Sequence, residues 1–129
     1  MEGSKREYLG FRDLECWKAA REVRQFASKM IKRFPSDEKY VLTSQLRRSA
    51  RSACSNIAEG YGRFHFKENI QFCRIGRGSL FETSDHFEVA LEEEYISRNE
   101  FLEAEALIAK ASSLMNGYIN YLKRQKTDA

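Results

Sequence analysis

The chain has 129 residues, of which 42% are hydrophobic and 32% charged, and its net charge at pH 7 is +3. This length supports one domain that buries roughly two thirds of its unfolded surface, and it excludes two such domains. No apolar stretch approaches the roughly eighteen residues that cross a membrane, and the first residues lack the apolar core of a secretory signal, so we expect a cytoplasmic protein without a membrane partner.

Apolar residues recur at steps of three and four from Leu14 to Phe34. This spacing predicts a first amphipathic helix, with Asp13 at its start. Pro35 should end the helix, because proline lacks an amide proton and disfavours helical geometry in the residue before it. The chain contains no other proline, so long helices and an all-α fold are favoured.

The second predicted helix covers residues 42–58 and combines small residues with arginines. Residues four apart share a helix face, so one narrow face is small and a neighbouring face is strongly cationic. Gly60 and Gly62 should end this helix with a left-handed turn. The small residues are Ala50, Cys54 and Ala58, and the arginines four apart are Arg47 and Arg51.

A third helix is predicted from about residue 67 to about residue 96, and a fourth from Phe101 to about Arg124. Gly76 and Gly78 fall inside the third helix, where a glycine costs about 1 kcal/mol relative to alanine. The pair therefore predicts a close crossing with another backbone.

Four helices joined by short turns predict an antiparallel up-down-up-down bundle over residues 11–124. Residues 1–10 are expected to form a flexible arm and residues 125–129 a frayed tail. Several apolar residues lie off the main stripes and indicate a partner surface, for which identical copies are the commonest partner. These residues are Phe26, Ile31, Phe64, Phe66, Phe72, Ile75 and Phe81.

Charge is segregated along the chain. Residues 43–78 hold seven basic residues against two acidic ones, and residues 79–107 hold nine acidic residues against one basic one. If the second and third helices pack antiparallel about their connecting turn, arginines of both helices lie at the same height along the bundle. Their positive charges then repel one another unless an anion neutralises them. That anion is either nucleic-acid phosphate, whose oxygens suit the planar guanidinium group of arginine, or the acidic stripe of a neighbouring subunit. The candidate nucleic-acid-binding residues are Arg47, Arg48, Arg51, Arg74 and Arg77, with Arg63 and Lys67 as lesser contributors, and the acidic stripe is Glu82, Asp85, Glu88 and Glu92.

Aromatic and basic residues also mix at the junction of the second and third helices. Tyr61, Phe64 and Phe66 stand beside Arg63, which suits stacking on exposed bases. Alternatively, these rings form a hydrophobic plug at the end of the bundle. Glu59 lies near a helix C-terminus, where a carboxylate needs a partner, and the predicted partner is either Arg63 or the chain's own turn.

The sequence contains no catalytic constellation. Cys16, Cys54 and Cys73 are odd in number and widely spaced, so we expect reduced thiols and no metal site. Glu82 and His86 are four apart, but a di-iron bundle needs paired Glu-x-x-His motifs from two helices. No histidine lies near the serines of the second helix to act as a base, and no glycine-rich phosphate loop is present. We expect a protein that is not an enzyme and has no cofactor.

Five short motifs between Phe11 and Glu82 carry a family resemblance that covers roughly Phe11 to Leu122. They are Phe11-Arg12-Asp13-Leu14 with Trp17, Phe34-Pro35 with Glu38, Leu42-Thr43-x-Gln45-Leu46-Arg47-Arg48, Asn56-Ile57-Ala58-Glu59-Gly60 with Arg63, and Gly78-Ser79-Leu80-x-Glu82. In order and spacing they resemble the four-helix-bundle proteins encoded in the intervening sequences of bacterial 23S ribosomal RNA genes. A match over several segments is more specific than one short motif.

The resemblance implies an origin linked to ribosomal RNA genes, a ring-shaped homopentamer of bundles, and binding of RNA or DNA. It also implies kinship with the accessory variability proteins of diversity-generating retroelements, which bind a reverse transcriptase and nucleic acid. Gly76 departs from the family, whose members usually carry a small residue such as alanine there, and this predicts a looser third helix in the same place.

Two functional hypotheses follow. The leading one is a non-enzymatic homo-oligomer that binds nucleic acid through its basic surface. The alternative is a protein-interaction scaffold, for example an accessory subunit for a reverse transcriptase, whose arginines serve subunit assembly.

Overall fold

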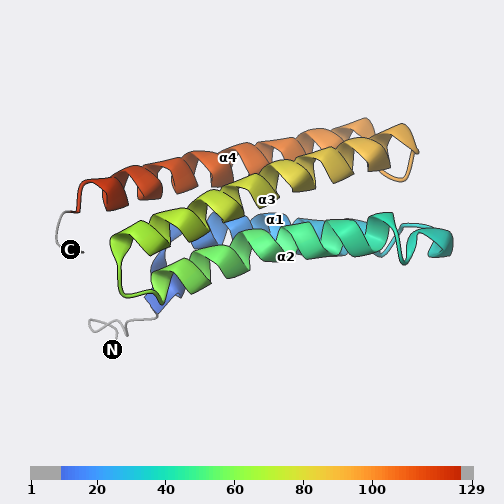
Figure 1. The fold of residues 1–129 in the computed structure, drawn as a ribbon. Helices are drawn as coiled ribbons and strands as arrows, with labels where there is room; N and C mark the ends of the chain where they lie inside the picture. The colour runs from blue at the N-terminus through green and yellow to red at the C-terminus, as the bar shows by residue number, and fades with distance from the viewer. Residues whose placement is uncertain (1–9, 126–129) are drawn as a thin grey trace, which may run out of the picture.

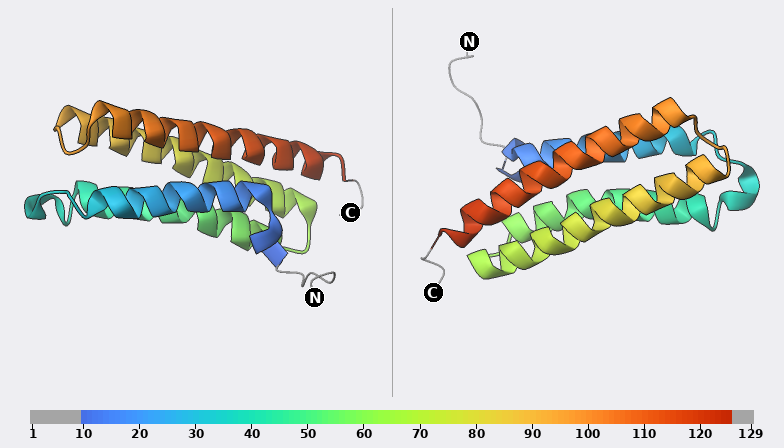
Figure 2. Two further views of the ribbon diagram at one scale, coloured as in Figure 1. Left: turned by 180° about the vertical axis from the view of Figure 1, so that it is seen from behind. Right: turned by 90° about the horizontal axis from the view of Figure 1, so that it is seen from above.

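The computed structural model describes residues 10–125, which form an antiparallel bundle of four helices and contain no strand (Figure 1). Each helix packs against two neighbours, in the cyclic order α1, α2, α3, α4. The α1–α2 and α3–α4 connections lie at one end of the bundle, and the α2–α3 turn lies at the other (Figure 2). The predicted all-α, up-down-up-down bundle is therefore confirmed. The helices are α1 (Glu15–Ile31), α2 (Leu42–Tyr61), α3 (Phe66–Glu92) and α4 (Arg98–Lys123), with short 3-10 helices η2 (Gly10–Asp13) and η3 (Ser36–Glu38).

Two of the predicted partner-surface residues belong to the core instead. Phe26 is 8% exposed, and its ring centroid lies 5.9 Å from that of Phe87 on α3. Ile31 is also buried. Phe64, Ile75 and Phe81 are 90%, 52% and 61% exposed, so the prediction of uncovered apolar surface holds for these three.

The first helix is shorter than its apolar pattern predicts, because it begins later and ends earlier. Asp13 lies in η2, and Leu14 is the N-cap of α1 without a side-chain capping bond, so the helix starts one residue later than predicted. The helix ends at Ile31, and the amide of Phe34 then donates to the Ile31 carbonyl in a turn that leads into Pro35.

Two helix ends show how local chemistry sets the boundaries. The third helix ends at Glu92, four residues before the predicted end, because Glu94 adopts a left-handed φ of 64° and breaks the helical path. In the predicted turn before α4, the Ser97 side chain accepts from the Glu100 amide while the Glu100 side chain accepts from the Ser97 amide. This reciprocal capping satisfies amides that the first helical turn leaves without partners.

Close packing of α2 on α3 depends on glycine at two positions. A Cβ atom on Gly60 would lie 2.9 Å from the Phe72 Cβ, and one on Gly76 would lie 3.1 Å from the Ala53 carbonyl oxygen. The predicted crossing is thus confirmed at Gly76, whereas Gly78 has nothing within 4 Å and takes no part in it. Gly62 has φ −78°, so the predicted left-handed stop is wrong.

The predicted arm over residues 1–10 and tail over residues 125–129 fall almost wholly outside the described residues. Within residues 10–125, no helix combines the length and apolar character needed to cross a membrane.

Candidate functional site

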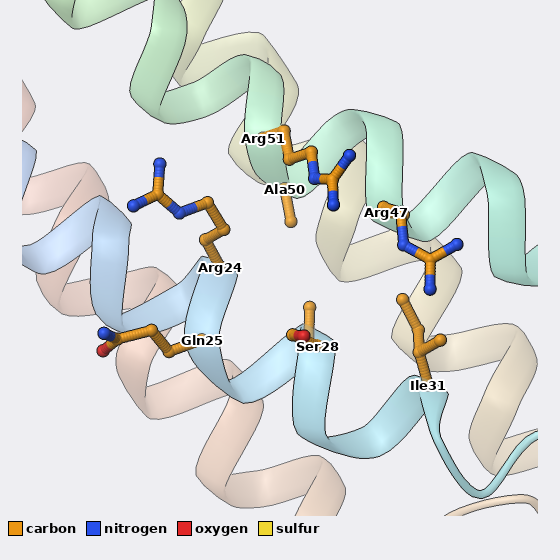
Figure 3. Close-up of a pocket in the computed structure, with 8 residues that line it drawn as sticks. Arg24, Gln25, Ser28, Ile31, Arg47, Ala50 and Arg51 are labelled. Atoms are coloured by element: carbon orange, nitrogen blue, oxygen red, sulfur yellow. The ribbon is translucent and has the colours of Figure 1, made fainter.

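The groove between α1 and α2 is hollowed and lined by arginines from both helices (Figure 3). Arg24 reaches into it from α1, and Arg47 and Arg51 reach into it from α2, over a floor that includes Ala27 and Ala50. The hollow has a volume of about 210 Å³. The hollow stays open because the side chains of Ala27 and Ala50 are small.

Two further hollows adjoin the first and share its arginines. One extends past Arg24 and Arg51 to Phe11 and Trp17, with a volume of about 510 Å³. The other lies along the outer side of α2, shares Arg47 and Arg51, and measures about 420 Å³. We call the three together the arginine trough. Its charged lining residues are Arg12, Arg24, Arg47, Arg48 and Arg51.

Among residues 10–125, the trough carries positive charge without a compensating carboxylate in its lining. None of the described residues that line its three hollows is an aspartate or a glutamate. Arg47, Arg48 and Arg51 are exposed, and the ion pairs seen across residues 10–125 do not use them. The cations in those ion pairs are Lys18, Arg33, Arg63, His86 and Lys110.

At one end of the trough, guanidinium groups cover an aromatic pair. The ring centroids of Phe11 and Trp17 lie 5.3 Å apart with their planes at 68°. The guanidinium carbons of Arg21 and Arg24 lie 5.0 Å and 5.7 Å from the Trp17 centroid, within the range of cation–π attraction. Burial raises the pKa of the nearby Cys54 thiol to about 11, while the charges of Arg24 and Arg21 oppose that rise. Cys54 is therefore a packed, protonated thiol.

The sequence-predicted arginines divide into two groups. Arg47, Arg48 and Arg51 lie together in the trough, but Arg74 and Arg77 do not join them. Packing places Ala53 against Gly76, and the hydroxyls of Ser49 and Thr83 share a buried hydrogen bond of 2.8 Å.

The α2–α3 register therefore differs from the predicted one by about one helical turn, and the predicted gathering of all five arginines at one level is wrong. Arg77 donates to the Asn116 side-chain oxygen on α4 at 2.7 Å, on the other side of α3. Arg74 is exposed on α3 and lines none of the three hollows.

The two lesser candidates belong to the α2–α3 end of the bundle. Arg63 pairs with Glu59 at 3.1 Å, as predicted, and its guanidinium carbon lies 4.7 Å from the Phe72 ring centroid. Lys67 is exposed in the first turn of α3. In the aromatic junction beside them, Phe66 packs against the core whereas Phe64 is exposed. The plug interpretation therefore fits Phe66 and does not fit Phe64.

Sequence reasoning missed the contribution of α1 to the basic surface. Trp17, Arg21, Arg24, Ser28 and Ile31 follow one another at steps of four and three, so they form one stripe of the helix. This stripe begins and ends in apolar residues but carries arginine at two positions. That pattern was the available sign that α1 contributes to the basic surface. Within residues 10–125, no three or more His, Cys, Asp or Glu side chains cluster in a way that could hold a metal ion.

Comparison with known proteins identifies the family. The model of the 23S rRNA-intervening sequence protein family matches residues 12–117. The chain belongs to this family. A crystal structure of a protein of unknown function from the S23 ribosomal protein family of Bacteroides thetaiotaomicron matches with a TM-score of 0.74 and 21% sequence identity. The match covers 81% of this chain and 97% of that chain, and it shows a shared fold. No curated protein matches the chain.

Proposed function

We propose that this 23S rRNA-intervening sequence protein is a non-enzymatic protein that binds nucleic acid, RNA or DNA, through the arginine trough. One observation carries the proposal: five arginines line adjoining hollows, and no acidic residue in the described part of the chain lines them. The positive charges of arginines that line one trough repel one another in the free protein. Phosphate groups relieve that repulsion, and the planar guanidinium group can donate two parallel hydrogen bonds to one phosphate.

Recognition of this kind is directed at the phosphate backbone. The affinity then depends on salt, because each neutralised phosphate releases counterions. The logarithm of the binding constant falls against the logarithm of the salt concentration with a slope of about 0.7 per phosphate contact for single strands and about 0.9 for duplexes. A nucleic-acid partner of this kind is consistent with a cytoplasmic protein.

The test removes two arginines that reach into the trough from α2. Arg47→Ala, Arg51→Ala should lower the salt slope by roughly 1.4 to 1.8, since two phosphate contacts are lost. Arg98→Ala, Arg124→Ala is the matched control, because it removes the same charge from exposed positions at the two ends of α4. Titrations of a labelled oligonucleotide over a salt series measure both slopes. An unchanged slope in the trough variant, or an equal fall in the control, removes the trough from the binding site.

We also propose that the bundles assemble into a ring-shaped homo-oligomer. Phe64, Ile75 and Phe81 are large apolar side chains that a single bundle leaves more than half exposed. The acidic residues Glu82 and Asp85 are exposed on α3 near Phe81 and could meet a basic surface of another copy.

The same residues favour the alternative function, a protein-interaction scaffold whose arginines serve subunit assembly. Light-scattering mass separates the two functions. A variant Arg47→Ala, Arg51→Ala that keeps the wild-type mass while losing salt-dependent binding supports the nucleic-acid function. A variant that falls to a monomer assigns these arginines to assembly.

A further inference from the structure

Phosphate binding by itself does not account for the aromatic end of the trough. The hollow that extends from Arg24 and Arg51 is lined there by Phe11 and Trp17. Trp17 is 7% exposed and belongs to the core, whereas Phe11 is half-buried, and the guanidinium carbon of Arg12 lies 4.6 Å from the Phe11 ring centroid. The accessible part of the site thus combines the Phe11 ring with guanidinium planes, the two kinds of surface on which unpaired bases stack.

We propose that the arginine trough takes a single-stranded segment of nucleic acid, with an unpaired base in the hollow at Phe11 and Trp17. The phosphates of that segment lie along Arg24, Arg47 and Arg51. This inference rests on the proposed function and specifies the form of nucleic acid that the site recognises.

The dimensions of the trough suit a single strand. It runs along α2 from Arg47 to Ala58, a length of about 16 Å at about 1.5 Å per helical residue. The axes of packed helices lie about 8–10 Å apart, so the groove between α1 and α2 is narrower than a nucleic-acid duplex, whose major groove alone is about 12 Å wide. A duplex can touch the rim of the groove, but its paired and stacked bases cannot reach the aromatic hollow. A single strand can enter and turn one base onto the Phe11 ring and the guanidinium planes beside it.

Arg24 connects the phosphate-binding and the aromatic parts of the trough, because it lines both hollows. Its guanidinium group lies farther from the Trp17 ring than that of Arg21, whose Nε atom is buried and lacks a hydrogen-bond partner among the described residues. A phosphate in the trough attracts Arg24 away from the indole, because a charge-assisted hydrogen bond is stronger than a long cation–π contact. Trp17 is the only tryptophan in the chain, so its fluorescence reports this event.

The experiment compares three probes: a single-stranded 12-mer, the same sequence annealed as a duplex, and a 12-mer backbone without bases. The single strand should change the Trp17 emission and bind on the order of tenfold more tightly than either of the other probes. Phe11→Leu keeps an apolar side chain of similar volume but removes the aromatic face. It should lower single-strand affinity by about fivefold or more and leave duplex affinity unchanged.

Phe11→Tyr is the second variant, because it retains the ring and should retain the preference for the single strand. Circular dichroism spectra of both variants check that the bundle is intact. Equal affinity for all three probes, an unchanged Trp17 emission at saturation, or a full preference in Phe11→Leu overturns this inference. The proposed function survives such a result if Arg47→Ala, Arg51→Ala still flattens the salt slope, and both fall if that variant binds as the wild type does.

Discussion

Alanine substitutions at two glycines should change stability in opposite directions, because only one of them lies where α2 and α3 touch. A Cβ atom on Gly60 would lie 2.7 Å from the Asn69 side-chain oxygen and 2.9 Å from the Phe72 Cβ. A Cβ atom on Gly78 would meet nothing within 4 Å. The pair therefore separates the effect of packing from the effect of helix propensity.

The magnitudes follow from these contacts. The Phe72 Cβ is attached to the backbone and cannot rotate away, so Gly60→Ala forces the helices apart. The Asn69 side chain donates to the Tyr118 hydroxyl at 3.1 Å, and its retreat weakens that bond. Overpacking of this kind costs about 1–3 kcal/mol, against a gain in helix propensity of about 1 kcal/mol. The weakened hydrogen bond adds about 1 kcal/mol to the cost, so we expect Gly60→Ala to lower the free energy of unfolding by about 1–3 kcal/mol and Gly78→Ala to raise it by up to about 1 kcal/mol.

Urea denaturation followed by circular dichroism measures both changes, at one protein concentration because assembly shifts apparent stability. Gly76→Ala should fall between the two, since its Cβ would lie 3.1 Å from the Ala53 carbonyl oxygen. Gly60→Ala as stable as the wild type, or more stable than Gly78→Ala, would refute the close contact on which the α2–α3 register depends.

Two further predictions concern titrating groups. Hydrogen bonds from Arg33 are the main reason that the pKa of Glu100 falls from 4.5 to about 2. The ionised Glu100 side chain therefore stabilises the fold fully above about pH 4.5, and this stabilisation is lost as the pH falls toward 2. The difference in unfolding free energy between the wild type and Glu100→Gln should shrink over that window, and a difference that stays constant down to pH 2 would contradict this cause. Burial raises the pKa of the Cys16 thiol to about 12 and those of Cys54 and Cys73 to about 11, so a thiol reagent at pH 7 should label all three only after unfolding. Rapid labelling of the native protein would show that at least one of them is accessible.

Local features of the fold were predictable from the sequence because they depend on residues three or four positions apart. The four helices, the Glu59–Arg63 pair and the burial of Cys54 and Cys73 are of this kind. Helix ends were less predictable, since Glu94 takes a left-handed conformation without being glycine, and Gly62 does not take one.

The candidate site was predictable only in part. Arg47, Arg48 and Arg51 share one helix, so their proximity follows from the sequence alone. Arg24 joins them only because α1 packs beside α2, and residues on separate helices carry no sign of their pairing.

The sequence by itself thus determined that this protein is a four-helix bundle with a cationic second helix, because helical periodicity is a local property. The tertiary structure decided which arginines share a groove. The reason is that the helix register depends on close contacts such as that of Gly60 with α3, and a shift of one turn moves a charged side chain about 5 Å along the bundle.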